Sequence, residues 1–181
     1  VPDHPETLRY HHGSRFRAVS FGDYAGFRDD RPADIVHAWT TRENVRQFCE
    51  RIGAADRSRL IIHLEDHELH ILCASLGRPV ESLLALPDAE LNALVTPTQA
   101  HPRRSREFLA SAAAVTVIVN RLRELVPPGR PVSLLQPAAP ACAFFERPVP
   151  WALREALGWG RDHTLLFYHG NVHATNRDEV G

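Results

Sequence analysis

Residues 34–52 read DIVHAWTTRENVRQFCERI, and this stretch decides the fold class. The apolar run Asp34–Trp39 predicts a strand. The segment that follows it has the spacing of a helix-capping box, in which Thr40 caps a helix and Glu43 reaches back to the cap. Apolar side chains then recur at the spacing of one helix face, at Val45, Phe48, Cys49 and Ile52. A strand followed at once by an amphipathic helix indicates a βαβ unit.

The same alternation of strand and helix continues along the chain. Leu60–Ile62 predicts a buried strand, and a helical period over Leu69–Leu76 follows it. Val115–Val119 is continuous and β-branched, which is typical of a parallel strand covered on both faces, and Val132–Leu135 predicts another strand. Further helical patterns lie at residues 79–95 with a break at Pro87, at 104–112 and at 121–126. The sequence therefore predicts an α/β fold with a Rossmann-like parallel sheet flanked by helices.

Length, charge and cysteine content exclude several classes of protein. The chain has 181 residues, which suits one domain with part of a second, and its formal net charge is -1. Such a charge creates no global field toward nucleic acid, so no nucleic-acid partner is expected. The three cysteines lack metal-ligand spacing and indicate reduced thiols in a cytoplasmic protein. No apolar run approaches the roughly 20 residues that span a bilayer, although the complete protein could associate peripherally with the inner face of a membrane.

A first candidate site follows the strand Asp34–Trp39. Ligands of an open parallel sheet bind beyond the carboxyl ends of its strands. Trp39 stands at such an end beside a helix N-terminus, where it can form a platform for a sugar or another flat ligand. Unpaired backbone N–H groups at that terminus would favour an anion. The alternative is structural, with a buried Trp39 and an ordinary helix cap over residues 40–43.

A second candidate site follows the strand Leu60–Ile62. Six ionisable side chains stand within eight residues, at His63, Glu65, Asp66, His67, Glu68 and His70. Carboxylates gathered at a strand end can orient hydroxyls or act as acid–base groups. The order of His67, Glu68 and His70 does not match the HExxH zinc motif. A hydroxyl-binding or catalytic role is favoured over a solvated helix start, and metal binding is the least favoured alternative.

A third candidate site, His169-Gly170-Asn171, follows a predicted strand at Leu165–Tyr168. A glycine between a strand and a helix lets the backbone approach a phosphate, and it can equally form a simple turn. The proline-rich stretch Pro137–Pro150 precedes this unit and predicts a linker.

The three candidate sites, taken in this order, resemble the GT-B glycosyltransferases, in particular the retaining enzymes of glycosyltransferase family 4. ADIVHAWT (33–40) resembles a strand end of that family, and RLIIHLEDHE (59–68) resembles the next strand, where the family places a histidine facing the reacting sugar. VTVIVNRLRELVPPGRPVSLLQPAAP (115–140) and LREALGWGRDHTLLFYHGNVHATNRDEV (153–180) resemble the passage into the family's C-terminal domain. The resemblance rests on order and spacing from about Asp34 onward.

The resemblance implies a sugar transfer from a nucleotide-sugar donor to a hydroxyl of a carbohydrate or lipid-linked acceptor, in polysaccharide or glycolipid synthesis. It implies neither a cofactor nor a bound metal. Glu65, Asp66 and His67 would lie near the reacting sugar as catalytic residues. The implied substrate-binding residues are Trp39, Thr40, Arg42, Glu43 and Asn120 in the cleft, with Gly170 and Asn171 at the donor diphosphate.

The chain departs from the family pattern in three places. The first βαβ unit with its glycine-rich turn is not recognisable, Pro137–Pro140 stands where the family has a glycine, and the donor-site glutamates would lie beyond Gly181. We therefore expect a fragment that starts at an internal residue, Val1, and does not catalyse transfer alone. Its parts would be an acceptor-side domain at 1–136, a linker at 137–150 and the start of a donor-binding domain at 151–181.

Two other classes of function stay open. A non-enzymatic Rossmann-like binding module would have no need for the linker and the strand-glycine element after residue 136. A hydrolase or metalloenzyme built on the histidines would be detected by a metal assay. The absence of a first strand also predicts an exposed apolar edge or face of the sheet.

Overall fold

The structure, a computed structural model, describes residues 18–24, 33–57, 59–136, 151–160 and 162. The chain divides into two units, residues 1–136 and 137–181, and each is described by itself. In the second unit the described residues include helix α7 (Trp151–Ala156). The predicted linker at 137–150 and the predicted strand Leu165–Tyr168 lie outside the described residues.

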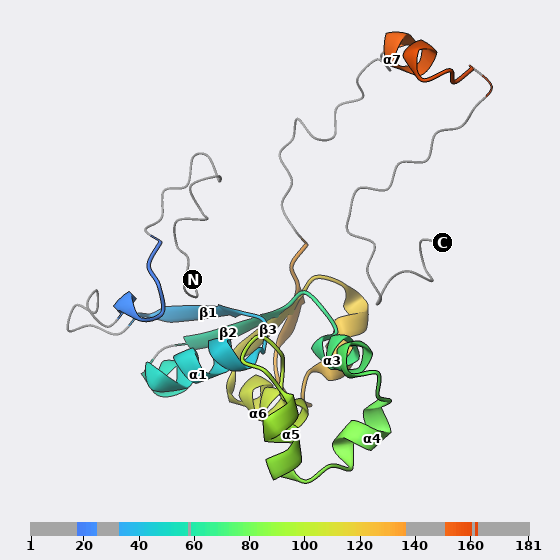
Figure 1. Cartoon of the computed structure of the whole chain (residues 1–181). Helices are drawn as coiled ribbons and strands as arrows, with labels where there is room; N and C mark the ends of the chain where they lie inside the picture. Colours follow the sequence, from blue (N-terminus) through green and yellow to red (C-terminus); the bar gives the residue numbers. More distant parts are fainter. Residues whose placement is uncertain (1–17, 25–32, 58, 137–150, 161, 163–181) are drawn as a thin grey trace. The chain divides into compact units, whose positions relative to one another are not determined.

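The first unit is built on a four-stranded sheet in which all neighbouring strands are parallel (Figure 1). Its order follows the chain, as β1-β2-β3-β4. The strands are β1 (Ile35–Trp39), β2 (Arg59–Leu64), β3 (Ala114–Val117) and β4 (Val132–Leu134). The predicted α/β fold with a Rossmann-like parallel sheet is therefore confirmed.

Helices connect the strands, as the alternating pattern predicted. They are α1 (Glu43–Arg51), α2 (Ala54–Arg57), α3 (Glu68–Leu76), α4 (Val80–Leu84), α5 (Asp88–Leu94), α6 (Pro102–Ser111) and the 3₁₀ helix η3 (Asn120–Leu125). The predicted break at Pro87 is confirmed, because Pro87 precedes the first residue of α5. Helix α6 starts two residues earlier than predicted, since the side chain of His101 caps it and Pro102 fits its first turn.

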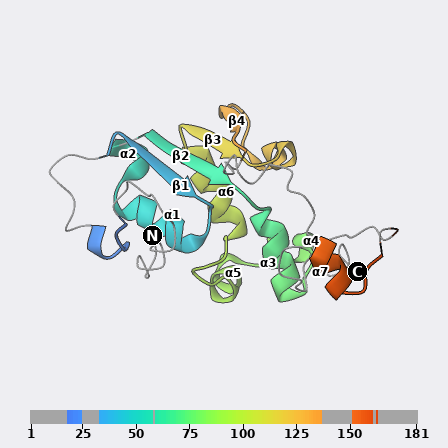
Figure 2. The ribbon, with the colours of Figure 1, turned by 90° about the horizontal axis from the view of Figure 1, so that it is seen from above.

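Helices α1 and α6 lie on one face of the sheet (Figure 1, Figure 2). A right-handed crossover between parallel strands fixes the face on which its helix lies, and successive crossovers in one direction use the same face. Side chains of both helices form the main core with the strand residues of that face. Thr116 on the opposite face is only half-buried and β3 ends at Val117, so the prediction that Val115–Val119 is a strand covered on both faces is wrong.

Strand β1 forms an open edge of the sheet in the described part of the chain. Its only hydrogen-bonded neighbour there is β2. Ile35 and Trp39, the first and last residues of β1, are large apolar residues, yet they are 56% and 50% exposed. For the residues that the structure describes, the predicted exposed apolar edge is confirmed.

The start of α1 corrects the predicted capping box. The residue before the helix is Arg42, and no side chain caps the helix. Thr40 has a positive φ of 82°, and its hydroxyl donates to the carboxylate of Glu68. The backbone N–H groups of Glu43 and Asn44 donate to the carbonyl oxygens of two residues in the loop before α6, at 2.9 and 2.8 Å. They are therefore not available to an anion, and that prediction is wrong.

A buried ion network joins α1 to α6. The Glu43 side chain accepts from Arg46 Nη2 at 2.7 Å and from Arg104 Nη1 at 3.3 Å. Burial alone would raise the pKa of Glu43, but the two arginines outweigh it and hold the pKa below the usual 4.5. The stabilisation is therefore present above pH 4.5 and is lost as the pH falls through the folded-state pKa. Glu43 has a packing role here, and its role in substrate binding stays a prediction.

Replacing Glu43 by alanine should lower the free energy of unfolding by about 3 kcal/mol, because Arg46 remains buried without its main partner. Denaturant unfolding at neutral pH measures this loss. Glu50→Ala is the matched control, since Glu50 pairs with the same arginine from an exposed position and should cost about 0.5 kcal/mol. Equal losses in the two variants would contradict the assignment of this network as a buried one.

Candidate functional site

The structure brings the first two candidate sites together at the carboxyl edge of the sheet. Trp39 and His63 are register partners on β1 and β2, and their ring centroids are 4.2 Å apart. The indole N–H of Trp39 donates to Glu65 Oε2 at 2.9 Å. A half-exposed tryptophan, an imidazole and an exposed carboxylate therefore form one cluster, although they come from two predicted sites.

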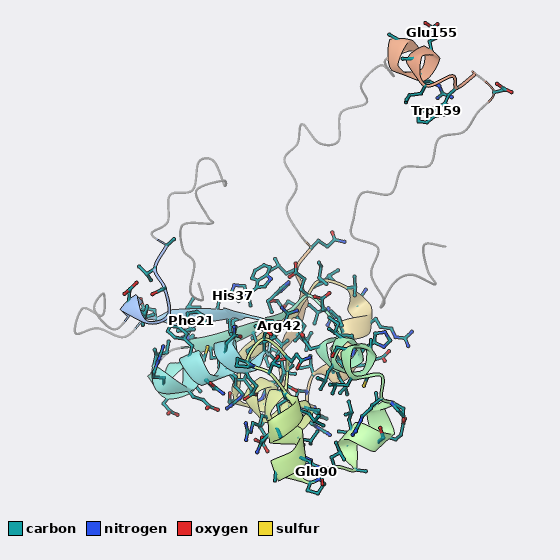
Figure 3. The ribbon with its side chains drawn as sticks, viewed as in Figure 1. Phe21, His37, Arg42, Glu90, Glu155 and Trp159 are labelled. Atoms are coloured by element: carbon teal, nitrogen blue, oxygen red, sulfur yellow. The ribbon has the colours of Figure 1, made fainter. Side chains whose placement is uncertain are left out.

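Two further residues extend this cluster over the face of the sheet opposite to α1 and α6. We call this face the open face. The ring of His37 lies 5.5 Å from Trp39 and 6.1 Å from His63, and Figure 3 shows His37 beside the sheet on the side away from α6. Thr116 Oγ1 lies 2.8 Å from His63 Nδ1. We call His37, Trp39, His63, Glu65 and Thr116 the open-face cluster.

Sequence reasoning missed His37 and Thr116 as members of this cluster. Residues two apart on a strand point to the same face, so the position of His37 relative to Trp39 was a usable signal. Thr116 offered no such signal, because its proximity depends on the register of β2 against β3, which pairs it with His63.

His63 is the buried centre of the open-face cluster. Its side chain lies on the open face but is only 2% exposed. The low exposure results from its contacts with Trp39, His37 and Thr116. Burial lowers its pKa, the nearby imidazole of His37 lowers it further, and the negative charge of Glu65 opposes both effects. His63 is therefore a neutral imidazole at neutral pH.

Behind the cluster, Glu68 ties the turn after β1 to the start of α3. Its carboxylate accepts from the Thr40 hydroxyl. Both of its oxygens also accept from Arg42 Nε, at 3.0 Å for Oε1 and 3.1 Å for Oε2. The backbone N–H of Thr40 also donates to the carbonyl oxygen of His63 at 2.9 Å. Thr40 and Arg42 were both predicted to bind substrate. In the structure they connect the turn after β1 to the turn after β2.

The three predicted catalytic residues are all exposed, but each one contacts a different part of the fold. Glu65 bonds Trp39 on the open face. Asp66 lines a pocket of about 890 Å³ on the helix side of the sheet. His67 caps α3, and its Nδ1 accepts from the backbone N–H of His70 at 3.1 Å. In the neutral ring the proton of His67 therefore sits on Nε2.

The other predicted binding residues lie in different places. Asn120 is exposed at the first position of η3, and its Oδ1 accepts from Arg123 Nε at 3.0 Å. Gly170 and Asn171 lie outside the described residues.

Within the ranges that the structure describes, no group of three or more His, Cys, Asp or Glu side chains is placed to hold a metal ion. Cys49 and Cys73 are buried thiols. Burial raises the pKa of both, that of Cys49 to about 11, which keeps them protonated and unreactive. No helix of the described residues is long and apolar enough to cross a membrane.

No protein-family model, curated protein or solved structure matches this chain. The open-face cluster, which includes the exposed Glu65, and the neighbouring exposed Asp66 are the features from which a function is inferred.

The depressed pKa of His63 predicts a dependence of stability on pH. Below about pH 6.5 the unfolded chain takes up a proton that the folded chain resists. The free energy of unfolding should therefore fall as the pH drops from about 6.5 toward the folded-state pKa of His63. Denaturant unfolding between neutral pH and about pH 5 measures this slope.

His63→Asn should reduce that slope. The slope should not vanish, because burial also lowers the pKa of His101. An identical slope in the wild-type protein and His63→Asn would contradict the assignment of a buried neutral imidazole.

Proposed function

We propose that this chain is the acceptor-side part of a glycosyltransferase that moves a sugar from a nucleotide-sugar donor to an acceptor hydroxyl. The observation that carries the proposal is the half-exposed indole of Trp39, held by Glu65 at the carboxyl edge of a parallel sheet. That edge is where open α/β sheets bind their ligands. The order of motifs that resembles family 4 is the second support.

The chemistry of the open-face cluster suits a hydroxyl-rich ligand. An exposed aromatic face can stack against the apolar side of a sugar ring, and the hydrogen bond to Glu65 fixes the orientation of the indole. Ionised carboxylates accept hydrogen bonds from hydroxyls and cannot donate. Glu65 lies in the cluster and can orient an acceptor hydroxyl or take its proton. Asp66, the next residue, lines the pocket on the other side of the sheet edge and is proposed to act on the reacting sugar from there.

The remaining parts of the proposal concern the complete protein. The acceptor oxygen would bond to the anomeric carbon of the sugar as the bond to the leaving diphosphate breaks. Gly170 and Asn171 are proposed to bind that diphosphate, in a donor-binding domain that starts near residue 151. A cytoplasmic enzyme acting on a carbohydrate or lipid-linked acceptor, close to the inner face of a membrane, fits this proposal.

Binding of simple sugars tests the acceptor site. In a panel of methyl glucoside, galactoside and mannoside, at least one should bind the 181-residue chain, and Trp39→Ala should weaken it about tenfold, a loss of about 1.4 kcal/mol. Ligand-observed NMR titration measures this. Trp159→Ala is the matched control, because Trp159 is a similarly exposed tryptophan in the second unit. No binding, or an equal effect of the two substitutions, would contradict the proposal.

Turnover by a longer protein that contains this chain tests the catalytic assignment. Asp66→Asn should lower kcat at least about tenfold with the free energy of unfolding unchanged, because it removes a charge near the reacting sugar. Glu90→Gln, an exposed carboxylate on α5 (Figure 3), is the control and should keep its turnover. The 181-residue chain alone should show no transfer. Normal kcat in Asp66→Asn would contradict the assignment.

His67 also caps α3, so a test of its catalytic role must keep the cap. His67→Ala would remove the cap of α3 and cost about 1 kcal/mol of stability. His67→Asn keeps a side-chain acceptor for the cap while removing the imidazole. A lowered kcat in His67→Asn at unchanged stability is the expected result, and an unchanged kcat would leave His67 with its capping role alone.

A further inference from the structure

A buried histidine, His101, caps the start of α6 and is 2% exposed. Its Nδ1 accepts from the backbone N–H groups of Arg103 and Arg104, both at 3.3 Å. A ring nitrogen that accepts a hydrogen bond carries no proton, so the neutral ring is protonated at Nε2. The side chain of His101 therefore caps α6 only while the ring is neutral.

A positively charged ring would lose this cap without gaining another hydrogen bond. Both ring nitrogens of a protonated imidazole are donors, so Nδ1–H would face two backbone N–H groups at the positive end of the helix. Among the described residues the buried Nε2 of His101 has no hydrogen-bond partner. Proton uptake therefore replaces two hydrogen bonds by a repulsion.

The charged groups that surround His101 do not compensate for a positive ring. Burial is the largest cause that holds the pKa of His101 below the usual 6.5, and the guanidinium groups of Arg104 and Arg103 lower it further. Glu43 of α1 and Asp88 of α5 act in the opposite direction. Each of these carboxylates is already paired with one of the two arginines.

The loop that leads into His101 also holds the start of α1. The backbone N–H of Glu43 donates to the carbonyl oxygen of Gln99 at 2.9 Å. That of Asn44 donates to the carbonyl oxygen of Pro97 at 2.8 Å. No side chain caps α1, so the carbonyl oxygens of this loop take the place of a cap, and the start of α1 depends on the position of the loop.

The first turn of α6 contacts two other parts of the fold. Arg103 Nη2 donates to the carbonyl oxygens of Leu84 and Leu86 at 2.9 and 2.7 Å. Arg104 Nη1 lies 3.3 Å from the buried carboxylate of Glu43. Because both arginines follow directly after the cap, loss of the cap loosens the contacts of α6 with α1 and with the segment between α4 and α5.

We propose that His101 is a pH-sensitive switch, in which the neutral ring holds the starts of α6 and α1 and proton uptake releases both. The switch does not depend on the proposed function. Helix α1 begins at Glu43, directly after the turn that Thr40 and Arg42 bind to Glu68. The released segment therefore adjoins the carboxyl edge of the sheet.

The direction of the pH dependence follows from the two states of His101. Above about pH 6.5 the ring is neutral in both states, and the capped state is favoured. As the pH falls from about 6.5 toward the pKa of the capped state, only the released state takes up a proton. The equilibrium then shifts toward release by up to about tenfold for each pH unit.

Hydrogen exchange of the 181-residue chain, followed by NMR between about pH 7.5 and pH 5.5, tests the switch. Protection factors, which are corrected for the intrinsic rate at each pH, are compared for three amides. Those of Glu43 and Asn44 should fall by up to about tenfold for each pH unit below about pH 6.5. Both should stay below that of Ile118, whose N–H donates to the carbonyl oxygen of Leu64 in the sheet at 3.0 Å. Equal protection of all three amides would mean that only global unfolding exposes them and would overturn the inference.

His101→Asn removes the titrating ring and keeps a side-chain acceptor for the cap, since asparagine is among the strongest N-cap residues. The protection of Glu43 and Asn44 should then be independent of pH over this range. His63→Asn is the matched control, because it removes another buried histidine and leaves the cap of α6 in place, so the wild-type response should persist. A wild-type response in His101→Asn contradicts the switch, and His101→Ser replaces that variant where circular dichroism shows it unfolded.

The ring nitrogens of His101 give a second measurement on the wild-type chain. In long-range ¹H–¹⁵N spectra above about pH 6.5, Nδ1 should have the chemical shift of an unprotonated nitrogen and Nε2 that of a protonated one. A protonated Nδ1 at neutral pH would overturn the inference, because such a ring cannot accept from Arg103 and Arg104.

Discussion

The handedness of the crossovers between parallel strands determines the rest of this structure. Because the strand order follows the chain, each crossover continues in the same direction and places its helix on the same face. Helices α1 and α6 therefore cover one face, and the outer positions of β1 remain open on the other. The carboxyl edge of the sheet consequently has two different sides, an aromatic one at Trp39 and an apolar pocket beside α6.

That edge is held in place by a strained turn. Thr40 adopts a positive φ of 82°, a conformation that costs a non-glycine residue about 1–2 kcal/mol. The turn persists because Thr40 bonds His63 through its backbone and Glu68 through its hydroxyl, while Arg42 bonds Glu68 as well. Strain at an over-determined turn is typical of functional sites. The turn follows directly after Trp39, whose ring lies against that of its register partner His63.

The sequence was sufficient for features that depend on local period and on the parallel-strand rule. The strands follow from the alternation of apolar runs with helical patterns, and the break at Pro87 follows from the helix-breaking property of proline. The capping box at Thr40 was wrong because the carbonyl oxygens of Pro97 and Gln99, more than fifty residues later, satisfy the start of α1. No local pattern carries such a contact. For the same reason, the sequence could not predict the register of β2 against β3 that places Thr116 beside His63.

The side chains of Glu65 and Asp66 point to opposite sides of the sheet, and the alternation of side chains along a strand explains this. A run of adjacent acidic residues reads as one catalytic cluster in the sequence. In the fold, the two-residue period of β2 continues past Leu64 and turns these neighbours to opposite sides of the sheet. Only Glu65 reaches the indole of Trp39, and only Asp66 reaches the pocket. Two chemically different surfaces thereby begin at neighbouring residues, one at the indole of Trp39 and one at the pocket.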